Sequence, residues 1–434
     1  MKRSHILHCF SCLLAPGLVL LVTAFSAAQG VGKDDPLASV SMEELDNQAL
    51  KWGKTCKELF SGMTALDPKD ENQEKAIDAQ VRFTLYRLHD VKANEPGFAD
   101  RVFQNFEDSQ LKPILLNKEK NAGVPQLFTA KMIIHAKLVL QTPRPKYNVA
   151  AVNAARVLAK LTKLGQPELA DGLVDILKSE LEYDAKPTDF RRNDGVKLYV
   201  LRGLGEMLAL QSQNPPVLAK GQDAKIIDVL TKFIERKPPV EKNAPAEEVD
   251  GCRTLRREAV HALANGHVLP PHSALVLLRV TARDGLAPEP RMDERVEAAI
   301  GVLRLSFEDK TYQPDYAAYQ VALFVDALGA SVVKLKEEQR PLKIWAARLI
   351  DAMEAMKAEA TKPNTKNDAV VKVVDQCVTV LRGLEDKGTL NPATVTAFDT
   401  WLSSNPVAAD SLFKGVKDAT VKAANRPEDE PPEK

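Results

Sequence analysis

Apolar residues recur at steps of three and four along most of the chain, which is the spacing of an amphipathic α-helix. The clearest stripe lies in residues 193–210, where Arg202 and Glu206 fall on the opposite, polar side. Asn193 or Asp194 supplies a side-chain oxygen that can cap the start of this helix. The stripe itself consists of Val196, Val200, Leu204 and Met207/Leu208, with Leu201 on its flank.

The pentapeptide VLRGL occurs at residues 200–204 and again at 380–384, each time inside such a stripe. Gly203 and Gly205 lie within the first helix, although each glycine costs roughly 1 kcal/mol relative to alanine in a free helix. We infer that a neighbouring backbone passes close to these glycines. We also interpret the helix as a repeated unit, in which the last leucine of both pentapeptides is a core residue.

Helical patterns continue over nearly all of the remaining chain, and the short breaks between them carry proline or glycine. Ser41 and Glu44 form a capping box at the start of the first helix. Period-two alternation of β-branched residues is nearly absent, so no sheet is expected. The expected helices are 41–61, 72–90, 97–117, 125–141, 148–164, 167–182, 193–213, 222–236, 253–265, 271–283, 292–306, 315–330, 340–360, 367–385, 392–404 and 407–422.

Three of these helices share one order of small and aliphatic residues. The matching runs begin at Ala150, Val196 and Leu255, and each continues at the fourth, fifth and eighth steps. The starts lie 46 and 59 residues apart, whereas one helical pair of a repeat takes about 40–47 residues. We interpret the polar, proline-rich stretch 237–250 as the insertion that lengthens the second interval.

The matching runs include Leu255-Arg256 followed by Ala259 and Ala262-Leu263, and Val196-Lys197 followed by Leu204-Gly205. In this pattern the chain resembles the HEAT and armadillo class of helical repeats, over roughly residues 145–330. The resemblance implies a scaffold whose stacked hairpins present an extended concave surface to a partner. The predicted fold is therefore all-α, with antiparallel helical hairpins stacked as an α-solenoid, and an α/α-toroid is the alternative.

The start of the chain has the pattern of a signal peptide. Lys2 and Arg3 precede an apolar core, and small residues end the segment before Gln29. The apolar core is too short and too interrupted for a membrane anchor, so we expect export to the periplasm or the outside of the cell, without a transmembrane segment after cleavage. The expected divisions are a signal peptide at 1–28, an N-terminal helical region at 29–144, HEAT-like repeats at 145–330, a C-terminal helical region at 331–422 and a disordered acidic tail at 423–434.

The chain is close to neutral, with 59 Lys and Arg against 59 Asp and Glu. Removal of the signal peptide takes away two basic residues and no acid, which leaves a net charge of about −2. A balance this close to zero disfavours a general nucleic-acid binder.

The neutral total hides a cationic stretch. Residues 112–165 contain ten Lys or Arg and one acid, Glu119. Such a stretch can recruit an acidic protein or an anionic polymer, or it can be a solvated face that pairs with the acidic N-terminal helices. The candidate surface for an anionic partner consists of Lys118, Lys120, Arg144, Lys146, Arg156, Lys160 and Lys163.

The sequence carries no pattern that points to a reaction. It contains no P-loop, serine-hydrolase elbow, HExxH motif or haem site, so we predict no catalytic residue, metal site or cofactor. The mature cysteines are far apart and odd in number, and we expect buried thiols, with a single bridge left open: Cys56, Cys252 and Cys377. Turn residues interrupt the histidine group His261, His267 and His272, which disfavours zinc. A carboxylate pair among Asp284, Asp293/Glu294 and Glu308/Asp309 stays open.

These observations predict an exported helical-repeat scaffold that binds a protein or a polymer without catalysis. The alternative is an α-toroid enzyme, such as a polysaccharide lyase or hydrolase. Sugar clefts usually need aromatic stacking platforms, but the tryptophans are few and widely separated. We expect them to pack between helices: Trp52, Trp345 and Trp401.

Overall fold

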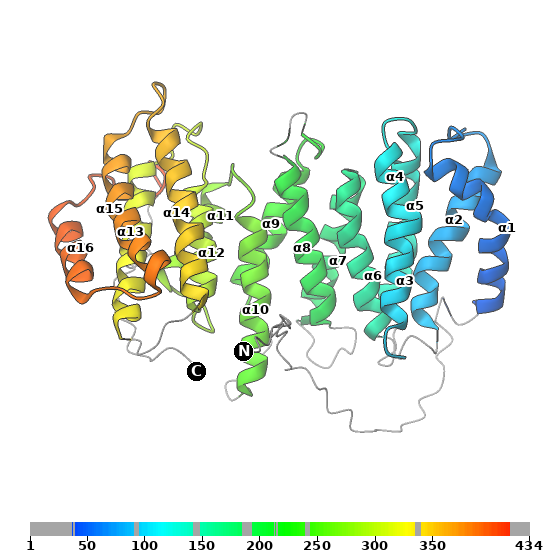
Figure 1. Ribbon diagram of the computed structural model, residues 1–434, viewed down its shortest axis with the longest axis horizontal. Helices are drawn as coiled ribbons and strands as arrows, with labels where there is room; N and C mark the ends of the chain where they lie inside the picture. The colour runs from blue at the N-terminus through cyan, green and yellow to red at the C-terminus, as the bar shows by residue number, and fades with distance from the viewer. Residues whose placement is uncertain are drawn as a thin grey trace, which may run out of the picture. The chain divides into compact units, whose positions relative to one another are not determined.

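The computed structural model describes residues 37, 40–90, 95–141, 148–184, 193–211, 213, 216–238, 244–334 and 340–416. Within these residues the chain is helical throughout and has no strand, and the helices pack against one another (Figure 1). The predicted fold class is thereby confirmed. The expected signal peptide at 1–28 and the expected tail at 423–434 lie outside the described residues.

The helices follow the sequence pattern closely. In chain order they are α1 (Met42–Phe60), α2 (Glu71–Tyr86), η1 (Arg87–His89), α3 (Phe98–Phe106), η3 (Glu107–Leu111), α4 (Lys112–Asn117), α5 (Gly123–Gln141), α6 (Asn148–Leu161), η5 (Thr162–Leu164), α7 (Glu168–Asp184), α8 (Asp194–Gln211), α9 (Gln222–Glu235), α10 (Ala246–Leu263), α11 (Pro271–Ala282), α12 (Met292–Leu303), α13 (Pro314–Val333), α14 (Arg340–Ala360), α15 (Asp368–Lys387) and α16 (Pro392–Ser404).

From α5 to α15 the helices form two rows, because each helix of this span packs on the one two places further along the chain. The even row is α6, α8, α10, α12 and α14, and the odd row is α5, α7, α9, α11, α13 and α15. Consecutive helices therefore lie in opposite rows, as in stacked antiparallel hairpins. Within the described chain, extensive packing joins only helices that are near in chain order, which is the arrangement of a solenoid.

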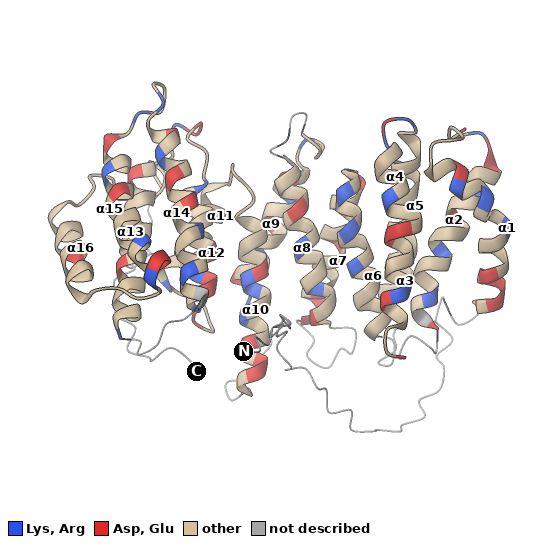
Figure 2. Cartoon of the chain, in the orientation of Figure 1, with Lys and Arg blue, Asp and Glu red and all other residues tan. Residues whose placement is uncertain are grey.

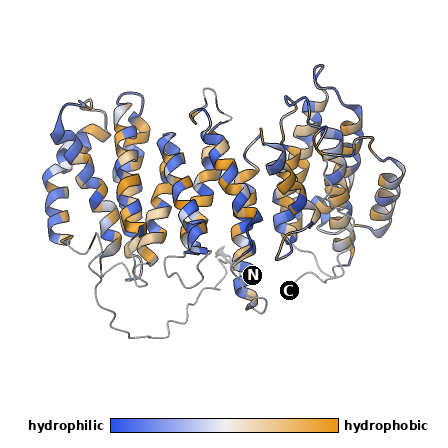
Figure 3. Ribbon diagram, turned by 180° about the vertical axis from the view of Figure 1, so that it is seen from behind, coloured by the Kyte–Doolittle hydropathy of each residue, from blue (hydrophilic) through white to orange (hydrophobic). Residues whose placement is uncertain are grey.

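The apolar stripes face the contacts between the helices. In Figure 3 hydrophobic and hydrophilic residues lie beside each other around the helices, as expected of amphipathic segments. α13 is the one described helix that is long and apolar enough to cross a membrane by length and composition. In the structure 72% of its most apolar window is buried, so packing within the stack uses this surface.

Two predicted helix starts are confirmed, although the capping box of the first is only half formed. The Ser41 hydroxyl accepts a hydrogen bond from the Glu44 N–H, at 3.3 Å, and opens α1, whereas the predicted return bond from the Ser41 N–H to the Glu44 side chain is not formed. Asn193 Oδ1 accepts from the N–H groups of Gly195 and Val196, at 3.0 and 3.3 Å, and opens α8. Local side-chain chemistry therefore sets where these helices start.

The three runs that matched in the sequence fall on α6, α8 and α10, which are successive helices of the even row. Their small and aliphatic residues are buried in all three: Ala154, Ala155 and Leu158, Val200, Leu201 and Leu204, and Ala259, Val260 and Leu263. The shared order of residues thus corresponds to a shared position in the stack.

The two VLRGL segments are not equivalent, and their interpretation as one repeated unit is wrong. Both last leucines, Leu204 and Leu384, are fully buried as predicted. However, the first copy lies on α8 in the even row and the second on α15 in the odd row. An identical pentapeptide can occur in both rows because it supplies the same apolar stripe. The stripe alone does not determine which helices pack against it.

Gly203 of the first copy and Gly205, just after it, do lie against neighbouring helices. A Cβ atom on Gly203 would stand 3.4 Å from the Cα of Ala159 in α6, and one on Gly205 would stand 2.9 Å from the Cα of Ala262 in α10, where backbone cannot move aside cheaply. In the second copy Gly383 takes the place of Gly203, and a Cβ atom on it would meet only the tip of Leu390, at 3.3 Å. The close approach inferred from the sequence is therefore confirmed for α8 and has no counterpart on α15.

We expect Gly205→Ala to lower the free energy of unfolding by about 1–3 kcal/mol, the usual cost of overpacking a tight contact. Gly383→Ala is the matched control, and it should raise stability by up to about 1 kcal/mol because alanine favours the helix. Thermal melts of the two variants provide the comparison. Equal shifts in the same direction would contradict the inferred crossing of α8 and α10.

Three details of the predicted boundaries are wrong. The expected helix 97–117 is interrupted by the π-helical turn η3. The expected insertion 237–250 ends early, because α10 already begins at Ala246. Glu247 and Glu248 lie in its first turn, where acidic side chains interact favourably with the helix dipole. Residues 407–416 of the expected last helix are non-helical, since Phe413 instead pairs with Tyr312 in an isolated antiparallel bridge.

Candidate functional site

The predicted cationic surface is largely neutralised where it lies on α6. Arg156 Nη1 is 2.9 Å from Asp100 Oδ1, and its guanidinium stacks 3.8 Å from the ring centre of Phe103. Lys160 Nζ is 3.2 Å from Glu107 Oε1. The acids come from α3 and η3, so this part of the stretch is a solvated face paired with the N-terminal helices.

Three other members of the predicted surface remain exposed. Lys118 and Lys120 lie in the turn between α4 and α5, and Lys163 lies in η5. Among the described residues none of the three has an ion-pair partner. Arg144 and Lys146 lie outside the described residues. Figure 2 shows both signs of charge interleaved over the helices.

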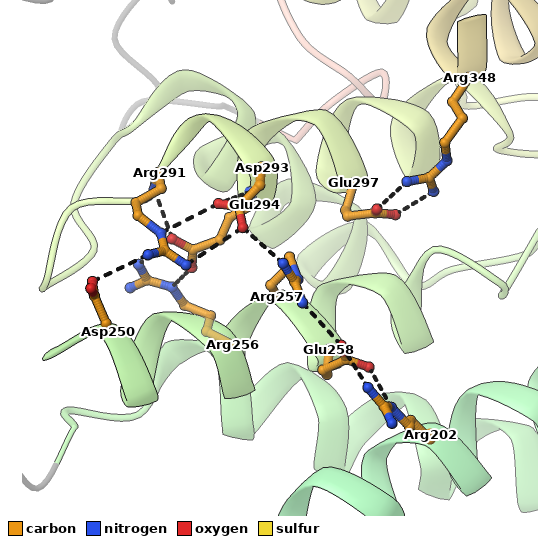
Figure 4. Close-up of polar contacts among 10 residues, drawn as sticks. All are labelled: Arg202, Asp250, Arg256, Arg257, Glu258, Arg291, Asp293, Glu294, Glu297 and Arg348. Carbon is orange, nitrogen blue, oxygen red and sulfur yellow. Dashed lines mark hydrogen bonds and ion pairs between the residues drawn. The ribbon is translucent and has the colours of Figure 1, made fainter. Parts of the chain in front are cut away.

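A second charged surface, which the sequence did not predict, crosses the even row. Arg202 of α8 donates from Nε to Glu258 of α10 at 3.0 Å. Arg257, next along α10, donates to the same carboxylate at 3.3 Å and to Asp293 of α12 at 3.0 Å. The three helices are therefore joined by one continuous chain of ion pairs (Figure 4). We call it the charge ladder, defined by Arg202, Arg257, Glu258, His261, Asp293, Glu297 and Arg348.

The ladder continues from α12 to α14 through Glu297. Its carboxylate accepts from both terminal nitrogens of Arg348, with Nη2 2.7 Å from Oε2 (Figure 4). The same carboxylate lies 2.9 Å from His261 Nδ1. Burial opposes ionisation of Glu297 most strongly, but the hydrogen bonds from His261 and Arg348 outweigh it and lower its pKa to about 2. Glu297 is therefore ionised at any ordinary pH and holds α10 and α14 across α12.

The basic side chains of the ladder, two arginines and His261, face outward and the acids face inward. The Arg202 side chain is 49% exposed above a Glu258 that is 13% exposed. His261 and Arg348 are 51% and 37% exposed above a Glu297 that is 11% exposed. Anything that approaches this face meets guanidinium and imidazole groups first.

Sequence reasoning missed the ladder because its partners on different helices lie 36 to 56 residues apart. From the sequence, Asp293/Glu294 are candidates for a carboxylate pair. In the structure each acid instead binds an arginine of α10: Asp293 binds Arg257 and Glu294 binds Arg256. A signal was present in the paired Arg256-Arg257 and Asp293-Glu294, but only helix stacking brings them together.

One ion pair lies wholly inside the stack, beneath the ladder. Arg256 Nε is 2.6 Å from Glu294 Oε1, and the side chains are 5% and 0% exposed. Burial raises the pKa of Glu294, against the hydrogen bonds and charge of Arg256. The Glu294 carboxylate also accepts from the backbone N–H of Arg291 at 2.7 Å.

A second buried charged cluster joins the ends of α7, α8 and α9. Lys197 Nζ is 2.5 Å from Asp184 and 2.9 Å from Asp194, and Arg236 Nε is 3.3 Å from Asp184. Glu180 lies beside them and accepts from the Asn193 N–H at 3.1 Å. Burial raises the pKa of Glu180 to about 7, although Lys197 acts in the opposite direction.

A third polar group links α2 to α5. The Tyr86 hydroxyl is 2.6 Å from His135 Nδ1, and His135 Nε2 is 2.9 Å from Asp78 Oδ1. Tyr86 is buried, and burial raises the pKa of its hydroxyl. The arrangement ties two helices together and does not present the hydroxyl to solvent.

The clustered histidines diverge in the structure. His261 lies beside Glu297, His272 Nε2 is 2.9 Å from Glu235, and His267 Nδ1 is 3.3 Å from the Arg304 carbonyl. The described part of the chain contains no group of three or more His, Cys, Asp or Glu that could hold a metal ion. Three cysteines are buried, as expected of packing thiols: Cys56, Cys252 and Cys377.

No family model matches the chain, and neither a curated protein nor a solved structure matches it. The function is therefore argued from the geometry of the described residues.

Proposed function

We propose that the protein is an exported helical-repeat scaffold that binds an anionic partner, a protein or a polymer, and catalyses no reaction. The single observation that carries this proposal is the charge ladder on the even row. It extends over α8, α10, α12 and α14 and turns Arg202 and Arg348 toward solvent. Stacked helices that present one uninterrupted face are suited to a long partner.

The geometry of the ladder supports recognition of acidic groups. A guanidinium has five N–H donors, and the buried acids use only some of those on Arg202, Arg257 and Arg348. The inner carboxylates hold the guanidinium groups in place, so little side-chain entropy is lost on binding. Glu206, an exposed acid on the same face of α8, is already bonded to the Thr162 hydroxyl.

The helical-repeat class and the export route are parts of the same proposal. The repeat runs on α6, α8 and α10 support a HEAT- or armadillo-like scaffold. The basic start, apolar core and small residues of 1–28 support a cleaved signal peptide. We therefore place the mature protein, from Gln29, in the periplasm or outside the cell.

A photo-crosslinking side chain at position 261, on the even row, tests the proposal in cells that make the protein. We expect the exported form to begin at Gln29 and to crosslink to a defined partner. The matched control places the same group at position 232, an exposed site of α9 in the odd row. Equal crosslinking from both positions, or a product that still carries Met1, would contradict the proposal.

The alternative function, a polysaccharide lyase or hydrolase, finds less support. Such a cleft needs aromatic rings that are free to stack on sugars. The tryptophans are partly buried and pack against the hydrophobic core, as the sequence predicted: Trp52, Trp345 and Trp401. They are therefore engaged in helix packing.

A further inference from the structure

Two turns at one edge of the stack are bound into a single tip. Asn121 Nδ2 donates to the Thr64 carbonyl at 2.9 Å, and the Leu66 N–H donates to Asn121 Oδ1 at 3.1 Å. Asn117, at the end of α4, also reaches the Phe60 carbonyl at 3.4 Å. The α1–α2 connection and the α4–α5 turn, at the upper edge of Figure 1, are thereby held side by side.

This tip carries two apolar side chains that no helix covers. Leu116 is 83% exposed and Met63 is 78% exposed. They flank the contact between the two turns, because Asn117 follows Leu116 and its Cβ would stand 3.3 Å from a Cβ on Gly62. Single exposed apolar residues are ordinary, but two that project from one rigid tip indicate a surface that becomes covered.

The unpaired lysines of the predicted cationic stretch gather at the same tip. Lys118 and Lys120 follow α4 directly, and Lys163 lies in η5, which packs on α4. The neighbouring cations Lys131 and Lys137, by contrast, have acidic partners at 2.7 and 2.8 Å.

Three acids at this edge offset most of the positive charge, because four lysines against three acids leave a net charge of +1 (Lys69, Lys118, Lys120 and Lys163). Glu119 lies in the turn itself. Asp67 and Asp70 lie in the α1–α2 connection, where they accept from the N–H groups of Lys69 and Asn72. Because the net charge is small, binding here needs the lysines and the apolar side chains together.

We propose that this tip docks the protein onto an anionic phospholipid surface. Leu116 and Met63 enter the headgroup region, and Lys118, Lys120 and Lys163 contact lipid phosphates. Apolar residues flanked by lysines are the composition of interfacial membrane anchors. The inference goes beyond the proposed scaffold function, since the tip lies on helices that do not form the charge ladder.

Because Leu116 and Met63 protrude from the tip, a lipid layer is favoured over an acidic protein as its binding partner. A rigid protein would need a preformed hollow for each projecting side chain, whereas a fluid headgroup layer closes around it. Each lysine near an anionic leaflet contributes about fivefold in affinity, so the three together contribute on the order of a hundredfold. The attraction should weaken with salt, because these charges are exposed.

The test is co-sedimentation of the exported form with vesicles of phosphatidylcholine, alone or mixed with phosphatidylglycerol. We expect binding to the mixed vesicles only. Replacing Lys118, Lys120 and Lys163 together by glutamine should weaken it about a hundredfold, and Leu116→Ser with Met63→Ser should weaken it severalfold. The matched control replaces Lys310, Lys372 and Lys387, which are exposed elsewhere, and should bind as the parent does.

Two outcomes would overturn the assignment. One is equal binding of the tip variant and the control, which would show that net charge alone acts. The other is binding of the parent to polyglutamate but not to the mixed vesicles, which would make the tip a site for an acidic polypeptide. All the replaced side chains are exposed, so unchanged thermal melts should accompany each result.

Discussion

Replacing Arg256 by leucine is expected to lower the free energy of unfolding by about 3–5 kcal/mol. The substitution leaves the Glu294 carboxylate, which is 0% exposed, without the cation that compensates its burial. The backbone N–H of Arg291 remains as a donor, but a single neutral donor does not replace a guanidinium. Denaturant unfolding at neutral pH measures the effect.

The control is the double variant Arg256→Leu with Glu294→Leu. It removes both charges, and an apolar pair of similar volume often stabilises as well as a buried ion pair, so most of the loss should return. The single variant should also recover stability as the pH falls, because protonation removes the uncompensated charge of Glu294. If the single and double variants unfolded alike at all pH values, the buried pair would have no role in stability.

Glu180 is expected to make the protein less stable as the pH rises through the range between 4.5 and about 7. Its pKa is raised from 4.5 to about 7 in the folded state, mainly by burial. Between these values the folded state holds a proton that the unfolded state has released. The free energy of unfolding therefore falls with rising pH, by on the order of 3 kcal/mol in total, and the stabilisation is complete only below the unfolded pKa.

Glu180→Gln should remove this part of the pH dependence, since the amide oxygen can still accept from the Asn193 N–H. When the free energy of unfolding is measured at pH 5 and at pH 8, the variant should lose less stability than the parent between the two. Glu182→Gln, an exposed change on the same helix, is the matched control and should keep the profile of the parent. Parallel profiles for Glu180→Gln and the parent would show that this carboxyl titrates normally.

The sequence predicted the features that depend on neighbours along the chain. A helix joins residues four apart, so its apolar period and its caps are visible locally. This is why the starts of α1 and α8, capped by Ser41 and Asn193, were identified correctly. The burial of Leu204 and Leu384 followed from the same stripes, and the all-α fold class followed from their number and spacing.

Only the structure shows which residues of the predicted cationic surface are exposed and which are paired with acids. Lys118, Lys120 and Lys163 are exposed as a ligand would require, whereas Arg156 and Lys160 pair with acids of α3 and η3. Sequence shows that ten cations lie near one another along the chain. It does not show which of them another helix neutralises.

Tertiary structure alone decided which helices share a row and which charges meet. The VLRGL copies are identical, yet Gly203 lies against the backbone of Ala159 in α6, whereas the equivalent Gly383 meets only a leucine tip. The partners of the charge ladder that lie on different helices are 36 to 56 residues apart. Helix formation is set by contacts within one or two turns, whereas the ion pairs and the close helix crossing exist only after distant segments have stacked.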